Sequence, residues 1–330
     1  RGAGAGHALL FYFGKSLWPF GLRPIYPLWS FQNPSFAQFL PWLLLAAIFV
    51  SLAWRRASWS RAALFGLGFF VLNLAPVLGF FPMSYLRISW VADHFVYLPV
   101  IGLIGLALAG AEALLQVHPR AKTAATVAVA AFLLALAGQS RAYAANFRGS
   151  VELWSYAVQC DPDSWLVQYN LGLTLMEHQQ RPAAEAALRR SLALNGSSYG
   201  THLALANLIA QTGHNAESAH EFAIALSLVP QAAAQSIEAH VNYGIVLSRL
   251  GDNAGSEHQY YLATLCTPLS PLGRADLAVA HFNLANILLQ RGQRADAIRH
   301  LQAALAAQPS LAQARNELAS LQAPAAAAPK

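Results

Sequence analysis

The stretch HFNLANILLQRGQRADAIRHLQAALAAQPS, residues 281–310, decides the fold of the C-terminal half of the chain. Small residues recur in it at fixed places, and a proline stands at its end; the marker positions are Leu284-Ala285, Gly292, Ala297, Leu301, Ala304 and Pro309. Small side chains let two paired helices approach closely, and larger apolar ones fill the space between them. The proline ends the second helix because it cannot continue the hydrogen-bond ladder. The stretch therefore predicts a pair of packed helices.

The same pattern occurs three more times upstream. The marker positions are Asn170-Leu171-Gly172, Ala184, Leu188 and Gly196; Leu205-Ala206, Gly213, Phe222, Ala225 and Pro230; and Tyr243-Gly244, Gly251, Tyr260, Ala263 and Pro268. From Leu171 to Leu205 the step is 34 residues, the length of a tetratricopeptide repeat. The next two steps are longer, so we expect insertions at 231–236 and 269–276.

Flanking segments complete the expected solenoid. Trp154, Ala157 and Pro162 match the second helix of a preceding half-repeat, and residues 310–322 have the polar character of a capping helix. The sequence thus predicts tetratricopeptide repeats over 148–322, followed by a low-complexity tail over 323–330.

The N-terminal half has a different composition. Over the whole chain 56% of residues are hydrophobic and 11% are charged, whereas a soluble domain carries about 25% charged residues. Within residues 1–147, four apolar stretches are long enough to cross a bilayer, at about 36–54, 62–86, 95–116 and 123–140. The shorter stretch at about 8–20 is interrupted by Gly14, Lys15 and Pro19, and predicts a helix lying at the membrane interface. A truncated end of a spanning helix is the alternative. The expected fold class is all-α: multi-spanning membrane helices followed by a tetratricopeptide-repeat α-solenoid.

The charges predict an orientation in the membrane. Residues 1–140 hold nine Lys and Arg against the acids Asp93 and Glu112, and most of these cations lie in the segments 54–61 and 118–122. Positively charged loops stay in the cytoplasm. The repeats then face the periplasm of a bacterial inner (cytoplasmic) membrane, and the positive charge indicates membrane topology rather than binding of nucleic acid.

Several motifs of the apolar half resemble one family of membrane proteins. They are FYFGKSLWP at 11–19, IYP at 25–27, GFF at 79–81 and VADHFVYL at 91–98. These runs are similar to those of bacterial TMTC-like and protein O-mannosyltransferase-like proteins of the GT-C glycosyltransferase superfamily, which carry C-terminal tetratricopeptide repeats. The resemblance implies transfer of a sugar from a polyprenyl-phosphate donor to a protein acceptor outside the cytoplasm, with a divalent cation as a possible cofactor of the complete protein.

The same resemblance implies that part of the protein precedes this chain. The acidic residues that such enzymes use as base and metal ligand are expected in a first outer loop, and no acidic residue precedes Asp93 here. The chain also starts at Arg1 without an initiator methionine. We therefore interpret it as a C-terminal portion, and whether it takes part in catalysis stays open. The alternative function is a non-enzymatic, membrane-anchored scaffold for protein–protein interaction.

Candidate site residues of the apolar half follow from their charge. Asp93 and His94 lie where the outer loop re-enters the membrane, and ionisable groups at such depth usually serve function. The alternative is an ordinary helix start, where an acid favours the helix dipole. Lys15, Arg23 and Arg87 are candidates for binding a lipid phosphate, or cations that extend to headgroups.

The candidate residues of the solenoid are asparagines. Asn170, Asn242 and Asn283 share one register, and Asn207 and Asn286 stand three positions further on. An amide side chain offers donors and an acceptor that suit a peptide backbone of any sequence. The pattern resembles the asparagine ladder of peptide-binding repeat proteins, although asparagine is also simply common at this place in such repeats.

The remaining sequence signals are few. Cys160 and Cys266 lie three repeats apart, too far for a disulfide, and predict free thiols. No spacing of ligand residues predicts a metal site.

Overall fold

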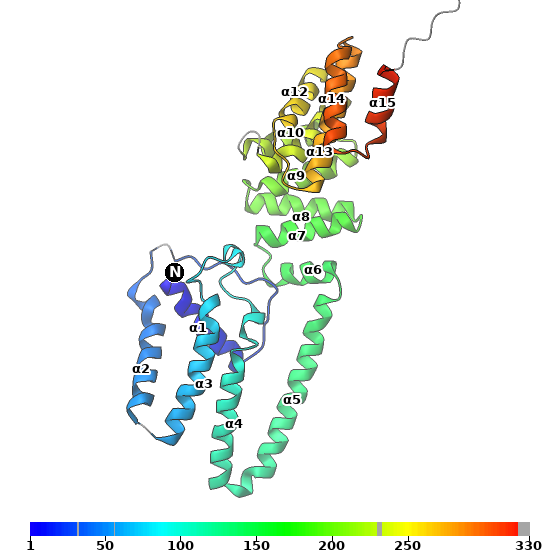
Figure 1. Ribbon diagram of the computed structural model, residues 1–330. Helices are drawn as coiled ribbons and strands as arrows, with labels where there is room; N and C mark the ends of the chain where they lie inside the picture. The colour runs from blue at the N-terminus through cyan, green and yellow to red at the C-terminus, as the bar shows by residue number, and fades with distance from the viewer. Residues whose placement is uncertain (32, 56, 230–232, 323–330) are drawn as a thin grey trace, which may run out of the picture. The chain divides into compact units, whose positions relative to one another are not determined.

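The computed structural model describes residues 1–31, 33–55, 57–229 and 233–322 (Figure 1). Within these residues the secondary structure is helical, with no strand. The α-helices are α1 (Gly2–Leu17), α2 (Leu40–Arg55), α3 (Ser58–Leu74), α4 (Val100–Val117), α5 (Lys122–Ala144), α6 (Ser150–Cys160), α7 (Trp165–Glu177), α8 (Arg181–Leu194), α9 (Tyr199–Gln211), α10 (Asn215–Ser227), α11 (Ile237–Arg249), α12 (Asn253–Thr264), α13 (Pro271–Gln290), α14 (Arg294–Ala307) and α15 (Ala312–Gln322). Short 3₁₀ helices include η1 (Phe36–Phe39), η2 (Ala75–Val77), η3 (Ser84–Arg87), η4 (Asp93–Val96) and η5 (Pro119–Ala121).

The chain divides into two compact units. We call Arg1–Val167 the apolar unit and the part from Gln168 onward the repeat unit. The division falls inside α7, later than the break after residue 147 expected from composition. Helix α6, the expected half-repeat, therefore belongs to the apolar unit by its contacts.

Helix α1 contributes to the core of the apolar unit and begins earlier than the stretch 8–20 expected from the sequence. Its small residues from Ala3 to Gly6 are buried, as is Tyr12. A side-chain carbon added at Gly4 would lie 2.6 Å from the Trp90 ring, so glycine is what lets this indole lie against the helix. The Trp42 indole donates a hydrogen bond to the Gly2 carbonyl at 2.8 Å. Small residues and tryptophans thus draw α1 inward, a contact that hydropathy alone does not reveal.

Four helical stretches in the described residues are long and apolar enough to cross a membrane. They are Phe36–Arg55, Trp59–Val77, Val100–Val117 and Pro119–Phe147. The second is shorter than the stretch 62–86 read from the sequence, because the helical stretch ends at Val77 and the chain turns at Gly79, whose φ is +91°. The third starts later than residue 95, since η4 precedes it.

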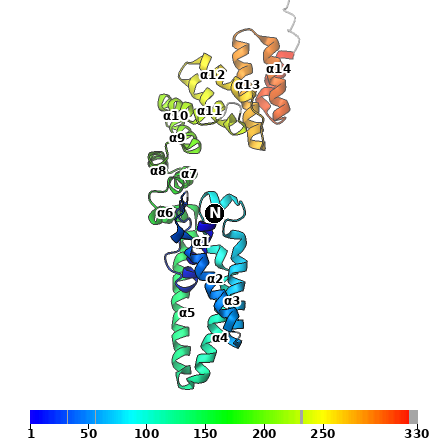
Figure 2. The same cartoon turned by 90° about the vertical axis from the view of Figure 1, so that its left-hand side faces the viewer.

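The repeat unit is an α-solenoid of helix pairs. Helices α7/α8, α9/α10, α11/α12 and α13/α14 form the four repeats, and successive pairs stack on one another (Figure 2). Gly213, Gly251 and Gly292 each turn the chain between the two helices of a pair with φ between +75° and +84°, and Gln179 does so in the first repeat with φ +57°. This shared left-handed residue fixes the repeat register, and α15 packs on α14 as the expected cap.

The small residues of the repeat pattern lie where the paired helices touch. A side-chain carbon at Gly172 would lie 2.7 Å from Leu188, and one at Gly244 would lie 2.6 Å from the Tyr260 ring. In two repeats a serine of the second helix also hydrogen-bonds to the backbone of the first helix. The Ser218 hydroxyl donates to the Ala206 carbonyl and the Ser256 hydroxyl to the Gly244 carbonyl, each at 2.8 Å. The close approach inferred from sequence is therefore present.

Two predictions fall partly outside the described residues. These are the proline that closes the second repeat, Pro230, with the start of the insertion after it, and the tail over 323–330. Both cysteines are free thiols, as predicted; Cys266 is buried and Cys160 is half-buried.

Candidate functional sites

A polar groove lies on the repeat unit between the first helices of the second and third repeats. Its cavity of about 700 Å³ is lined by Met176, Asn207, Ala210, Gln211, Gly213, Asn215, Asn242, Ile245, Val246 and Arg249. Because α9 and α11 supply most of these residues, consecutive repeats place equivalent positions in one row. Two of the five predicted asparagines, Asn207 and Asn242, belong to this lining.

These two asparagines are linked to each other and to a carboxylate. The Asn242 amide donates to Asn207 Oδ1 at 3.0 Å, and the Asn207 amide donates to Glu238 Oε1 at 3.0 Å. Each NH₂ group has a second hydrogen, and each oxygen can accept a second bond. The chain of contacts therefore holds both amides in a fixed orientation while hydrogen-bonding capacity remains for a ligand.

Arg249 is the one charged residue among the described residues that line this cavity, and it was not predicted from the sequence. Its Nη1 donates to the Ala210 carbonyl at 3.3 Å across the two helices, and the side chain is otherwise exposed. The signal that points to it is its position: Asn242 and Arg249 stand seven residues apart on α11, which is close to two helical turns and places them on one face.

The other three asparagines lie elsewhere on the solenoid. Asn283 on α13 lies near the Tyr260 side chain of the helix before it and lowers its pKa against the effect of burial. Asn170 lies on α7 and Asn286 on α13, and neither belongs to the cavity lining. A single ladder through all five positions stays a prediction, whereas the pair at Asn207 and Asn242 forms a defined site.

A second candidate site surrounds Asp93 in the apolar unit. A cavity of about 310 Å³ is lined by Phe11, Tyr12, Lys15, Pro19, Leu22, Asp93, Val96, Tyr97, Leu136, Gln139, Ser140 and Tyr143. The Tyr26 hydroxyl donates to Asp93 Oδ1 at 2.7 Å, and the Tyr143 hydroxyl donates to Oδ2 at 3.4 Å. The carboxylate thus joins η4 to α5 and to the loop after α1.

The electrostatics of this carboxylate combine opposing effects. Burial raises the pKa of Asp93, whereas the hydrogen bond from Tyr26, the positive charge of Lys15 and the Arg23 amide oppose the rise. Burial lowers the pKa of Lys15, and the nearby Asp93 opposes this. Burial also raises the pKa of Tyr26, and its bond to Asp93 adds to the rise.

The predicted charged residues of this region differ in whether their side chains line the cavity. Lys15 lines the cavity, but its Nζ donates to the Gly21 carbonyl at 3.0 Å. Arg23 contributes its backbone amide, which donates to the Tyr26 hydroxyl at 3.2 Å. Arg87 and His94 are exposed and lie outside the lining, with the His94 ring against Phe95. Asp93 and Lys15 are thus brought together, and Arg87 and His94 are not.

The tyrosines that hold Asp93 were not among the residues predicted from the sequence. Tyr26 stands in the IYP run at 25–27, and Tyr143 near the end of α5 is far from Asp93 in sequence. Only the fold brings them together. Among the described residues no group of three or more His, Cys, Asp and Glu side chains could hold a metal ion.

Comparisons with known proteins identify the repeat. Residues 278–311 match the family described as tetratricopeptide repeat. A comparison with curated proteins gives no match.

Solved structures with a similar backbone trace include MamA, at 16% identity and a TM-score of 0.42. The matched region covers 53% of this chain and 96% of the MamA chain. They also include YrrB, described as a TPR protein with an unusual peptide-binding site, at 15% identity and a TM-score of 0.36, covering 51% of this chain and 98% of that one. PilF of Pseudomonas aeruginosa matches at 14% identity and a TM-score of 0.43, covering 57% of this chain and 86% of that one.

The family match covers residues 278–311, and the solved structures share only 14–16% identity with the chain. None of them supports the resemblance to GT-C glycosyltransferases that was drawn from the apolar half. Over the residues that the structure describes, the chain is therefore all-helical with tetratricopeptide repeats, whose groove is suited to protein or peptide binding.

Proposed function

We propose that this chain is a membrane-anchored scaffold whose repeat groove binds an extended segment of a partner protein. The cavity lined by Asn207 and Asn242 carries the proposal. Both amides are held by hydrogen bonds and still have donors and acceptors to offer. A peptide backbone presents the complementary groups at every residue, so binding of this kind depends little on the side chains of the partner.

The anchor is supported by the exposed faces of α4 and α5. None of the apolar window of Val100–Val117 or of Pro119–Phe147 is buried in the chain itself. Burying apolar surface is worth about 25 cal/mol per Å², so the exposed apolar faces of these two helices are unfavourable in water and favourable in a bilayer. With the cationic loops around Arg61 and Lys122 on the cytoplasmic side, the repeats would face the periplasm of a bacterial inner membrane.

Photo-crosslinking from inside the groove tests this function. A photoreactive residue in place of Gln211, which lines the cavity, should capture a partner polypeptide in the membrane fraction of cells that express the full chain. The same residue in place of Ala223, an exposed position of α10 outside the lining, is the matched control. Equal capture from both positions, or capture from neither, would contradict the groove assignment.

A second candidate function is sugar transfer from a polyprenyl-phosphate donor, favoured by the Asp93 cavity. The half-buried carboxylate lies near the cation Lys15, in a cavity of about 310 Å³ that joins polar and aromatic side chains. Such a place could orient an acceptor hydroxyl beside a phosphate. In this scheme Asp93→Asn, made in the complete protein, abolishes transfer while membrane abundance stays unchanged. Unchanged transfer would leave the scaffold as the function.

A further inference from the structure

Three histidines of the repeat unit occupy one register. They lie on the first helices of consecutive repeats, and each ring nitrogen Nδ1 meets a side chain nineteen residues later on the second helix of the same repeat. The pairs are His202 with Glu221, His240 with Gln259, and His281 with His300. The geometry is the same in each repeat, but the chemistry of the partner changes from a carboxylate to an amide to a second imidazole.

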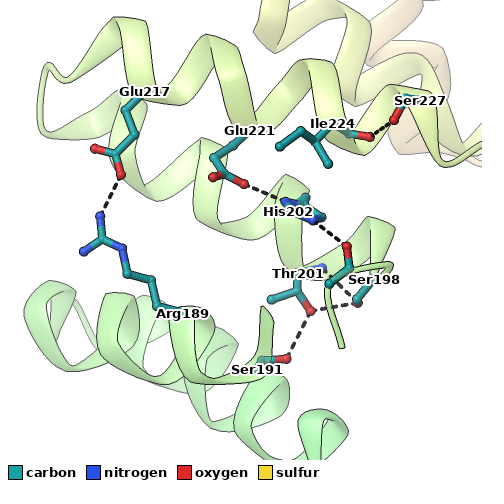
Figure 3. A network of polar contacts seen from close by, with 10 residues as sticks. Arg189, Ser191, Ser198, Thr201, His202, Glu217, Glu221, Ile224 and Ser227 are labelled. Atoms are coloured by element: carbon teal, nitrogen blue, oxygen red, sulfur yellow. Dashed lines mark hydrogen bonds and ion pairs between the residues drawn. The ribbon is translucent and has the colours of Figure 1, made fainter. Parts of the chain in front are cut away.

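The first pair tolerates a charged ring (Figure 3). His202 Nδ1 lies 2.6 Å from Glu221 Oε2, and Nε2 lies 3.1 Å from the Gly196 carbonyl oxygen. Both partners are acceptors, so a doubly protonated ring donates to each of them. An added proton on His202 therefore preserves both contacts and places a cation beside a carboxylate.

The middle pair is intermediate. His240 Nδ1 donates to Gln259 Oε1 at 2.8 Å, and this bond survives when the other ring nitrogen takes up a proton. The ring is buried, however, and burial lowers the pKa of His240; the bond to Gln259 opposes the shift and the nearby His258 adds to it. Acid therefore charges this ring with difficulty, but it breaks no contact.

The last pair keeps its contact only while one of its two rings stays neutral. His281 Nδ1 and His300 Nδ1 lie 3.0 Å apart, which requires one nitrogen to donate and the other to accept. A first added proton can enter at Nε2 of the donor ring and leave this bond intact, whereas a second proton on the acceptor sets two N–H groups and two positive charges against each other. Burial, with the charge of His300, lowers the pKa of His281 to about 4, and burial with Arg299 lowers that of His300 against the effect of Asp296.

Other titratable groups lie on the helices around this pair, and one of them, Glu257, is compensated by an ion pair. From α12, Glu257 and His258 line the same cavity as His300, and Glu257 is paired with Arg291. On α13, Asp276 faces Glu238 of α11, and burial followed by this like charge raises its pKa. On α15, Arg315 and Glu317 are the titratable residues, and neither lines the cavity.

We propose that the repeat unit has an acid-labile end, at which acidification separates α13 from α14 while the α9/α10 pair stays closed. The direction in which pH changes the stability follows from the lowered pKa values of His281 and His300. The unfolded chain binds protons near the ordinary pKa of about 6.5, before the folded pair does. The contribution of the pair to stability is therefore complete above about pH 6.5 and is lost as the pH falls from there toward about 4.

Hydrogen exchange of the full chain in detergent, followed by mass spectrometry at about pH 7.5 and about pH 5, tests the proposal. After correction for intrinsic exchange rates, the opening equilibrium of α13 and α14 should rise roughly tenfold at the lower pH, allowing for partial solvent screening. The opening of α9 and α10 should change by no more than about twofold. An equal change in both helix pairs would overturn the proposal.

Two variants separate this effect from general instability. His300→Gln removes one of the two imidazoles and gives His281 an amide partner like that of the middle repeat, so the acid response should diminish. His220→Gln, at an exposed position of α10, is the matched control and should respond to acid as the original chain does. Each variant is judged by its ratio of opening between the two pH values, so a lower baseline stability does not obscure the result. An undiminished acid response in His300→Gln would overturn the proposal.

Discussion

The two units of the chain use apolar residues in opposite ways. In α4 of the apolar unit, Ile101 and Leu108 are exposed, and no part of the apolar window of that helix is buried. In the last repeat, Leu284 and Leu301 are buried between paired helices. The comparison teaches that helix-forming apolar residues do not by themselves define a core. Their spacing along the helix decides whether they pack against a partner helix or stay exposed on the helix surface.

The largest expected effect is a charge placed in the middle of an exposed apolar helix. An arginine at the centre of a spanning helix costs about 2.5–3.5 kcal/mol, so Leu108→Arg should sharply reduce the fraction of the chain that resists alkaline extraction from membranes. The matched control is Leu265→Arg, at a similarly exposed leucine of the repeat unit. Equal loss in both variants, or in neither, would remove the distinction between the two units.

A smaller effect is expected where the repeat helices approach closely. Gly244→Ala adds a carbon 2.6 Å from the Tyr260 ring, and overpacking of this kind costs about 1–3 kcal/mol. Ser248→Ala, at an exposed position of the same helix, should change the free energy of unfolding by less than about 0.5 kcal/mol. Both values can be read from denaturant unfolding of the repeat helices by circular dichroism. Similar values for the two variants would mean that α11 and α12 do not pack at Gly244.

The smallest effect concerns the hydrogen bonds that tyrosines donate to Asp93 in the apolar unit. Tyr26→Phe removes the 2.7 Å bond to Asp93, and we expect a loss of about 1 kcal/mol. Because that bond lowers the pKa of Asp93, its removal should raise this pKa further. Tyr143→Phe, which removes a bond of 3.4 Å, should have less effect on the thermal midpoint in detergent. The reverse order would show that Tyr143 rather than Tyr26 orients the carboxylate.

Local signals made the repeat fold predictable. Gly213, Gly251 and Gly292 stand where each pair of helices turns, and Gly172 and Gly244 stand where paired helices touch. Each of these roles depends on neighbours within one repeat, so a sequence period is enough to reveal it. The end of α3 was less predictable, because hydropathy weighs apolar character and not the turn at Gly79.

Long-range contacts are what the sequence could not reveal. The burial of α1 depends on Trp42 and Trp90, which are distant from α1 in the chain. The hydrogen bonding of Asp93 likewise depends on Tyr143, which is distant in the chain. The candidate groove contains both residues that the sequence predicts and residues that only the fold reveals. Asn207 and Asn242 were found from their register, whereas Arg249 and the link to Glu238 required the packing of α9 on α11.

The most direct test of the proposed function is the affinity of the captured partner segment for the repeat groove, measured by titration calorimetry with the full chain in detergent. Each neutral hydrogen bond contributes about 0.5–1.5 kcal/mol, so replacing Asn207 and Asn242 together by alanine should weaken binding roughly five- to hundredfold. Asn286→Ala, outside the cavity lining, should leave the affinity unchanged. A doubly substituted chain that keeps its helical melting profile and binds as tightly as the original would contradict the account.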